Sequence, residues 1–178
     1  MKRNLSVAAI CAAMSIVPMS VSAVSTNYIP LGVPAINSSF KTYMDYRMVV
    51  NECSAQYKFI RAWGWSDYDG FMRCNGETDL GITDNYYMVA LGSYYGTEIG
   101  TKYKVTTDTG HQFYCVLSEC KDDADTNETH QYAGDNDIIE FLVDIDRLIG
   151  SVKEAGSANV YMPLNGSVMS IERIDFEN

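Results

Sequence analysis

Short apolar runs separated by polar, turn-forming residues divide the chain into extended segments. Residues 86–91 (YYMVAL) and 138–143 (IIEFLV) have the length and composition of buried strands. Residues 102–106 and 112–117 carry aromatic and β-branched residues on either side of Asp108-Thr109-Gly110. Asp and Gly are common in tight turns, so the last two segments predict a β-hairpin.

Two more pairs of segments flank dipeptides that favour tight turns. They are 57–65 with 71–73 around Asp69-Gly70, and 161–164 with 168–176 around Asn165-Gly166. Both pairs predict hairpins. Gly96 and Gly100 frame a Gly-Thr pair ahead of the strand from Thr101, which predicts a folded-back entry with positive φ at the glycines.

The remaining segments are less regular. Residues 24–39 are polar and contain Pro30 and Pro34, which suits an extended arm. Residues 40–50 fit a strand or one short helix, and residues 146–155 fit a short helix. The pattern predicts an all-β or β-rich single domain with little helix.

The first residues have the features of a secretory signal. Lys2 and Arg3 precede an apolar stretch over 5–21, and Val21-Ser22-Ala23 is a small-x-small cleavage pattern. We therefore expect residues 1–23 to be a signal peptide and the mature protein to be secreted, extracellular or associated with the cell wall. No later apolar run approaches the roughly 20 residues that span a bilayer, so no membrane contact is expected after cleavage.

The net charge of the mature chain argues against anionic partners. Removing residues 1–23 leaves 11 basic and 23 acidic residues, a net charge of −12. Such a chain repels nucleic acids and anionic lipid headgroups.

Four cysteines remain after the signal: Cys53, Cys74, Cys115 and Cys120. In an exported protein they allow three disulfide pairings, of which we favour Cys53 with Cys74 as a staple across the N-terminal half. Cys115 and Cys120 would lie about 16 Å apart on a straight strand and could bond only across a turn. No CxxC or HxxxH spacing indicates a zinc site.

Three consecutive segments carry a family resemblance: IGTKYKV from Ile99, TDTGHQFYCVLSE from Thr107 and DIIEF from Asp137. Over about 88–143 the chain resembles the double-psi β-barrel group of cell-wall proteins. This group includes the rare-lipoprotein-A type, the three-aspartate domain, membrane-bound lytic transglycosylase A and the first domain of expansins. SFKTYMDYR and VALGSYYG are also similar to uncharacterised secreted or phage-borne proteins of Gram-positive bacteria.

The resemblance implies a small six-stranded double-psi-like β-barrel over 86–178. Residues 24–85 would form an N-terminal arm and hairpin packed on that barrel. The implied substrate is peptidoglycan or a related glycan.

Within the resemblance, Glu119 and Glu140 occupy the positions of the two barrel acids. In lytic members the second acid protonates the glycosidic oxygen and then takes the proton of the C6 hydroxyl, for which a carboxyl with a raised pKa is suited. Both residues are Glu where the group has Asp, and Gly92 stands where the three-aspartate type has a further acid. Glu140 lies between Ile139 and Phe141, so its side chain is expected on the face opposite to theirs.

Aromatic and polar residues complete the candidate substrate site. Rings offer flat apolar surfaces on which sugars stack, although core and cross-strand packing is the more common use of such rings. The candidates are Trp63, Trp65, Tyr94, Tyr95, Thr101 and Lys102.

The acidic segment KDDADTNETHQYAGDND raises the question of calcium. Asp123, Asp125 and Asn127 alternate as at the start of a calcium loop, but Glu128 replaces the glycine at its sixth position and Gly134 the glutamate at its twelfth. The standard calcium hand is excluded, which leaves an irregular calcium site or a plain solvated loop. No other cofactor is expected.

Two classes of function follow. One is a lytic transglycosylase or glycoside hydrolase acting on peptidoglycan through Glu140 and Glu119. The alternative is a non-catalytic secreted module that binds glycan or a protein partner, or that assembles by strand addition. The first requires that the two glutamates meet in one cleft.

Overall fold

The structure is a computed structural model that describes residues 25–77 and 83–177. The expected signal peptide lies outside these residues. Within the described ranges, no helix has the length and apolar character needed to cross a membrane.

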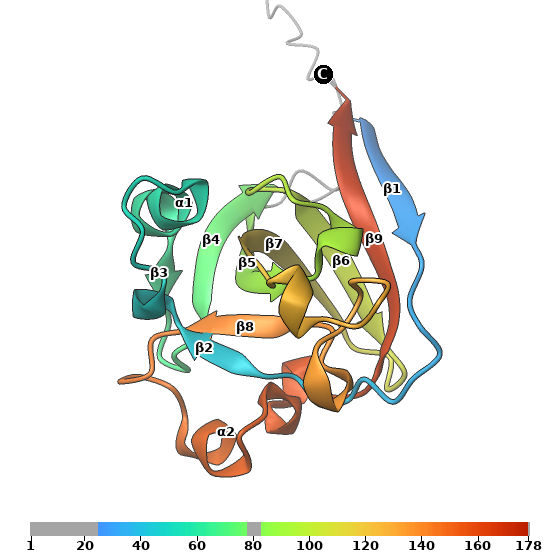
Figure 1. The fold of residues 1–178 in the computed structure, drawn as a ribbon. Coiled ribbons are helices and arrows are strands. Elements are labelled where there is room, and N and C mark those ends of the chain that lie inside the picture. Colours follow the sequence, from blue (N-terminus) through green and yellow to red (C-terminus); the bar gives the residue numbers. More distant parts are fainter. Residues whose placement is uncertain (1–24, 78–82, 178) are drawn as a thin grey trace, which may run out of the picture.

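The described chain is β-rich and contains nine strands and two short α-helices (Figure 1). The strands are β1 (Ser25–Leu31), β2 (Tyr43–Asp45), β3 (Trp65–Ser66), β4 (Met72–Glu77), β5 (Thr83–Leu91), β6 (Lys102–Thr107), β7 (Gln112–Cys120), β8 (Glu140–Val143) and β9 (Val168–Glu177). The helices are α1 (Ala55–Trp63) and α2 (Gly150–Ala155), and six 3-10 turns lie in the connections.

The strands form one mixed sheet in the order β1-β9-β6-β7-β5-β4-β3. Strand β8 pairs with β5 and with β2. Strand β5 therefore pairs with three strands, β4, β7 and β8. The β5–β7 and β2–β8 pairs are parallel and the other pairs are antiparallel. Over the described residues the sheet remains unclosed, and β1 adds an outer strand beside β9 (Figure 1).

Several expected elements are confirmed. The run at 86–91 lies in β5, residues 140–143 of the run at 138–143 form β8, and the hairpin around Asp108-Thr109-Gly110 is formed by β6 and β7. Gly96 and Gly100 have φ values of 134° and 98°, as expected of a folded-back entry into β6. The helix expected within 146–155 is the shorter α2.

The hairpin expected from residue 57 onward is wrong for most of its first strand, because 57–63 belong to α1. The Ser54 hydroxyl accepts a hydrogen bond from the Tyr57 amide and caps the helix, and Ile60 is buried on its inner side. Only Trp65–Ser66 forms a strand, which pairs with β4 across the bend at Gly70, where φ is 83°.

The expected terminal hairpin is also wrong. Met162–Leu164 form a 3-10 turn that contains Pro163, and β9 pairs instead with β6 and β1. The polar segment from residue 25 is therefore a strand at the sheet edge, where Pro30 is tolerated because an edge strand leaves amide positions unpaired. Residues 40–50 contain both a short strand, β2, and a 3-10 turn, Tyr46–Met48.

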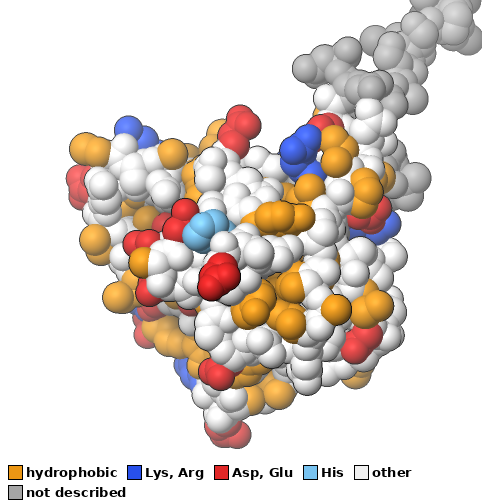
Figure 2. Space-filling view, turned by 45° about the vertical axis from the view of Figure 1, so that its right-hand side comes forward, with side chains coloured by type: hydrophobic (Ala, Val, Ile, Leu, Met, Phe, Trp, Pro, Cys, Tyr) orange, Lys and Arg blue, Asp and Glu red, His pale blue; other side chains and the backbone are white. Residues whose placement is uncertain are grey.

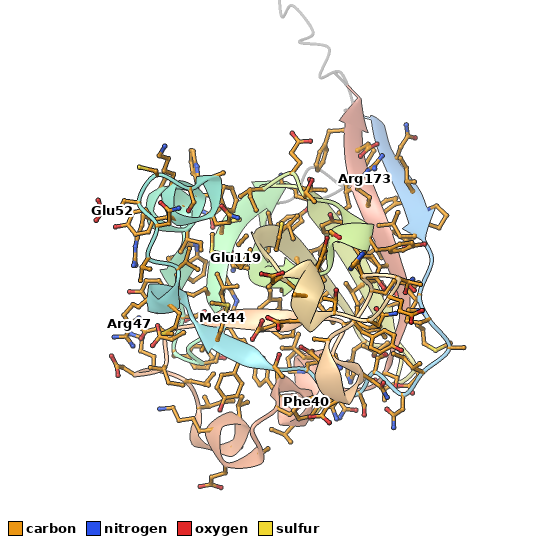
Figure 3. All side chains as sticks on the ribbon, in the orientation of Figure 1. Phe40, Met44, Arg47, Glu52, Glu119 and Arg173 are labelled. Carbon is orange, nitrogen blue, oxygen red and sulfur yellow. The ribbon has the colours of Figure 1, made fainter. Side chains whose placement is uncertain are left out.

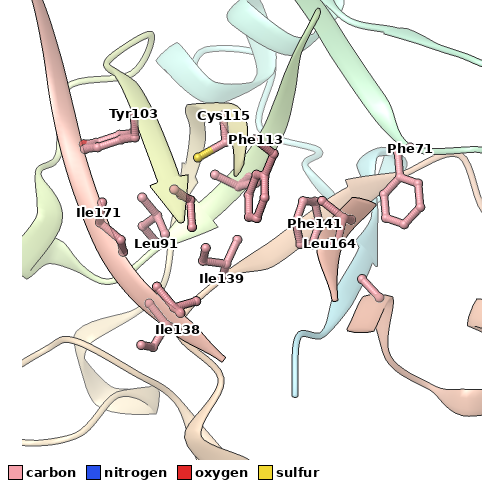
Figure 4. Close-up of a cluster of buried hydrophobic side chains, with 14 of the residues drawn as sticks. Phe71, Leu91, Tyr103, Phe113, Cys115, Ile138, Ile139, Phe141, Leu164 and Ile171 are labelled. Atoms are coloured by element: carbon pink, nitrogen blue, oxygen red, sulfur yellow. The ribbon is translucent and has the colours of Figure 1, made fainter. Parts of the chain in front are cut away.

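Two apolar clusters lie on opposite faces of β5. The larger cluster contains Val89 and Leu91 with residues such as Phe71, Phe113 and Phe141 (Figure 4). The smaller one contains Met88 and Ala90 with Val116, Leu142 and Ile60 of α1. Alternate residues of β5 therefore face different cores.

The expected Cys53–Cys74 disulfide is not formed. All four cysteines of the described residues are free thiols; Cys53 is exposed and Cys74 is buried in the smaller cluster. Burial raises the pKa of the Cys74 thiol to about 11, which keeps it protonated.

Candidate functional site

The two glutamates flank one small residue of β5. Ala90 is the register partner of Glu119 on β7 and of Glu140 on β8. Residues in register on neighbouring strands point to the same face. Both glutamates therefore lie on the face of the smaller cluster, as expected for Glu140 from its apolar neighbours Ile139 and Phe141, which are buried in the larger one.

A β-bulge aims Glu119 at this face. Leu117 pairs with Val89 and belongs to the larger core, so strict alternation would turn Glu119 to the same side. The register shifts between Val89 and Ala90, and Ser118 is the extra residue on β7. A bulge re-aims the side chain that follows it. The side chain of Glu119 consequently joins that of Glu140.

Both glutamates line one open cavity of about 730 Å³, with Ala90 between them. Neighbouring strands lie about 4.8 Å apart, so the two Cα atoms are roughly 10 Å apart across β5. Two carboxyl groups on one face at this spacing can approach a ligand from both sides. In Figure 3 the labelled Glu119 and Met44, which both line this cavity, lie near each other.

The surroundings raise the pKa of both carboxyls, but the neighbouring charges that contribute differ between the two. Burial raises the pKa of Glu119, and repulsion from Glu140 raises it further, against one backbone hydrogen bond. Burial also raises the pKa of Glu140; there the charge of Lys121 and a hydrogen bond from Thr42 act in the opposite direction, and the charge of Asp137 raises the pKa further. Glu119 has no cation among the causes of its shift, whereas the ammonium of Lys121 favours the charged form of Glu140.

A buried polar network supports the same cavity. Lys121 Nζ donates to Asp137 Oδ2 at 2.6 Å and to the Asp137 carbonyl at 2.9 Å. Thr42 donates its hydroxyl to Asp137 Oδ2 at 2.5 Å and its amide to Oδ1 at 3.2 Å. The carboxylate of Asp137 is thereby fully engaged, and it joins the chain just before β2 to the start of β8.

Sequence reasoning missed all three members of this network. Thr42 and Asp137 are 95 residues apart, and no local pattern links them. One signal was available, because Lys121 is the single basic residue in the acidic segment 119–137.

One wall of the cavity is apolar. It is formed by Met44 of β2 and by Met48, Val49 and Val50, which follow it. Met48 and Val50 are 69% and 74% exposed, so much of this wall faces solvent.

The expected substrate-binding residues do not gather around the glutamates. Tyr95, Thr101 and Lys102 line a second hollow of about 850 Å³ beside β9. Tyr95 is buried there, and the Lys102 ammonium lies 4.7 Å from the centroid of the Phe176 ring. Tyr94 is exposed and packs edge-on against Tyr95.

The two tryptophans line neither the glutamate cavity nor the hollow beside β9. Trp63 is 67% exposed at the end of α1, and Trp65 of β3 lines a small third hollow with Met72. Neither contributes to the lining of the cavity at Glu119 and Glu140.

The three candidate calcium ligands of the acidic segment, Asp123, Asp125 and Asn127, have different surroundings. Asp123 accepts a hydrogen bond from Ser93 Oγ at 2.6 Å, and the Asn127 side-chain oxygen accepts the amides of Gln131 and Tyr132. Asp125 instead lines the glutamate cavity. Within residues 25–77 and 83–177, no three His, Cys, Asp or Glu side chains are grouped so as to hold a metal ion.

Comparison with known proteins identifies no relative: no family model, no curated protein and no solved structure matches the chain.

Proposed function

We propose that the cavity at Glu119 and Glu140 binds a glycan of the bacterial cell wall and cleaves its glycosidic bond by acid–base chemistry. The observation that carries the proposal is the meeting of the two glutamates, 21 residues apart on strands β7 and β8, in one open cavity on either side of Ala90.

The unequal surroundings of the carboxyls suggest their roles. Glu119 keeps its proton and donates it to the glycosidic oxygen as the bond from C1 to that oxygen breaks. Glu140, whose charge is favoured by Lys121, takes the proton of the attacking hydroxyl. If the hydroxyl is the C6 group of the same sugar, an anhydro ring closes; if it belongs to water, the bond is hydrolysed.

This assignment divides between two residues the tasks that the family resemblance places on Glu140 alone. The resemblance to double-psi β-barrel proteins of the cell wall, carried by IGTKYKV, TDTGHQFYCVLSE and DIIEF, supports peptidoglycan as the substrate. The parallel pairing of β5 with β7 supports a crossed arrangement of these segments, within a nine-stranded sheet that is not closed into a barrel over the described residues. The expected secretion of the chain would bring it to that substrate.

The test is digestion of purified peptidoglycan by the wild-type protein and by Glu119→Gln and Glu140→Gln. Glu128→Gln is the matched control, because Glu128 is exposed on the nearby acidic segment and does not line the cavity. Mass spectrometry of the soluble fragments should show cleavage by the wild-type and control proteins. Loss of general acid–base catalysis should reduce the rate by about 10²–10⁴-fold in the two cavity variants.

The second candidate is a non-catalytic secreted module that binds glycan or a protein partner. The exposed apolar wall at Met48 and Val50 favours binding, because proton transfer does not require it. Intact peptidoglycan that carries bound protein and releases no fragments would support this candidate and end the catalytic proposal.

A further inference from the structure

Lys121 and Asp137 form a buried ion pair beside the two glutamates. Lys121 Nζ lies 2.6 Å from Asp137 Oδ2 and 2.9 Å from the Asp137 carbonyl oxygen, and the two side chains are only 4% and 3% exposed. Removing two charges from water is costly. The direct hydrogen bond is a path along which one proton can pass from the ammonium to the carboxylate, which leaves an amine in contact with a carboxylic acid.

Both partners of this pair are held in place by neighbouring strands. The Thr42 hydroxyl donates to Asp137 Oδ2 at 2.5 Å, and the Thr42 amide donates to Oδ1 at 3.2 Å. The backbone amide of Lys121 donates to the carbonyl of Leu91, at the end of β5, at 3.0 Å. An amine fixed against a carboxyl group in this way has a very high effective concentration, which favours a reaction between them.

Glu140 is the third group at this place. It lines the cavity with Lys121 and Asp137, and the amide of the next residue, Phe141, donates to the Thr42 carbonyl at 2.9 Å. Burial raises the pKa of Glu140, while the charge of Lys121 lowers it and the charge of Asp137 raises it. Glu140 thus interacts with both members of the pair, and a carboxyl in that position can carry a proton from one to the other.

We propose that Lys121 and Asp137 condense in the folded protein to an intramolecular amide bond, with Glu140 as the proton carrier. After its first proton has passed to the carboxylate, Lys121 Nζ attacks Asp137 Cγ, so that a C–N bond forms and the bond from Cγ to Oδ2 breaks. One of the three ammonium protons stays on the amide nitrogen, and the other two leave with Oδ2 as water. Nothing is oxidised or reduced, and Glu140 ends as it began.

The bond would join the end of β7 to the start of β8 and close the acidic segment between them into a ring. The two residues are 16 positions apart in the chain, and a covalent link of this kind restricts the unfolded chain and so stabilises the fold. The ion pair is the form of the site before condensation, and the effects of the Lys121 charge on Glu140 belong to that form. The inference goes beyond the proposed function, because condensation requires no glycan.

The test is mass spectrometry of the intact, denatured protein, sampled over time after purification at neutral pH. The wild-type mass should fall below the mass calculated from the sequence by that of one water molecule. Proteolytic digestion should then yield a branched peptide that joins the segments containing Lys121 and Asp137.

Two pairs of variants separate the roles of the residues. Lys121→Arg keeps a positive charge but has no amine to react, so it should retain the full mass, whereas Lys153→Arg, at an exposed position of α2, should lose water like the wild-type protein. Glu140→Gln should slow bond formation by about 10²–10⁴-fold, whereas Glu128→Gln, outside the cavity lining, should not slow it.

A wild-type protein that keeps its full mass after prolonged incubation would overturn the inference. A loss of water that persists in Lys121→Arg would also overturn it, because the water would then come from cyclisation of an aspartate onto its own backbone. Equal rates in Glu140→Gln and the wild-type protein would show that the assignment of Glu140 is wrong. The readout is the mass of the protein without substrate, so this inference and the proposed cleavage of peptidoglycan can fail independently.

Discussion

Two regions of the molecule place carboxyl groups out of full contact with water, and they treat them in opposite ways. In the turn before β4, Asp69 accepts hydrogen bonds from both terminal nitrogens of Arg73, from the Tyr161 hydroxyl and from the Phe71 amide. In the cavity beside β5, Glu119 and Glu140 share a less complete set of donors. Burial opposes ionisation in both regions, but the donors around Asp69 outweigh it and lower its pKa.

The contrast distinguishes a structural carboxylate from one available for chemistry. Asp69 is 1% exposed, and its charge is fixed by a bidentate partner. Glu119 and Glu140 lie in an open cavity with raised pKa values, and a raised pKa brings the titration of a carboxyl closer to neutral pH.

The largest effect is expected at the structural carboxylate. Arg73→Leu would leave Asp69 buried without its ion pair, and such a loss destabilises by about 3–5 kcal/mol. Urea denaturation measures the change. Arg47→Leu is the control, because Arg47 pairs with Asp45 and Asp146 at the exposed surface and should change stability little. Equal effects of the two substitutions would contradict the comparison.

In the ion-paired form of the site, Lys121→Met would remove the positive charge of Lys121 from the lining of the cavity. The substitution leaves Asp137 without its ammonium partner and removes the charge that lowers the pKa of Glu140. The pKa of Glu140 should rise, so the acidic limb of the pH–rate profile should move to higher pH. Lys121→Arg, which keeps the charge, should leave the profile close to that of the wild-type protein.

Ala90→Leu would fill the space between the two glutamates. Because Ala90 is buried on the floor of the cavity, overpacking should destabilise by about 1–3 kcal/mol. The larger consequence is functional: glycan binding and cleavage should fall together. Ala62→Leu on the exposed side of α1 should change neither. Full activity in Ala90→Leu would show that substrate does not enter between the glutamates.

The smallest effect is a dependence of stability on pH. A carboxyl whose pKa is raised by folding binds its proton more tightly in the native state, so stability falls as pH rises from the ordinary glutamate pKa through the folded value. Glu119→Gln and Glu140→Gln remove that fall. The difference in Tm between each variant and the wild-type protein should therefore depend on pH. The Tm of the variant minus that of the wild type should be a few degrees larger at pH 7 than at pH 4. A constant difference would contradict the raised pKa values.

The strands that the sequence predicts correctly are those whose pattern is local. The apolar runs in β5 and β8 and the turn at Asp108-Thr109-Gly110 specify their own structure. The prediction of a strand over 57–63 was wrong because the aromatic residues of this segment also fit a helix. The cap at Ser54 and the burial of Ile60 stabilise α1 instead.

The candidate site shows the same limit. Alternation placed Glu140 correctly, since it lies between two buried residues, Ile139 and Phe141. Glu119 reaches the cavity only through the bulge at Ser118, which no residue pattern announces. Asp122, Asp125 and Asp135 line the cavity because of how the loops between β7 and β8 fold. Acidic side chains are indeed scattered over the surface in Figure 2, and their number alone does not single out these three.

The most direct test is a carbon-13 NMR titration of the glutamate side-chain carboxyls, with Glu119 and Glu140 assigned by their Gln variants. Both carboxyls should titrate above the ordinary range of an exposed glutamate, and Glu140→Gln should lower the pKa of Glu119. Two independent titrations in the ordinary range of an exposed glutamate would contradict both expectations.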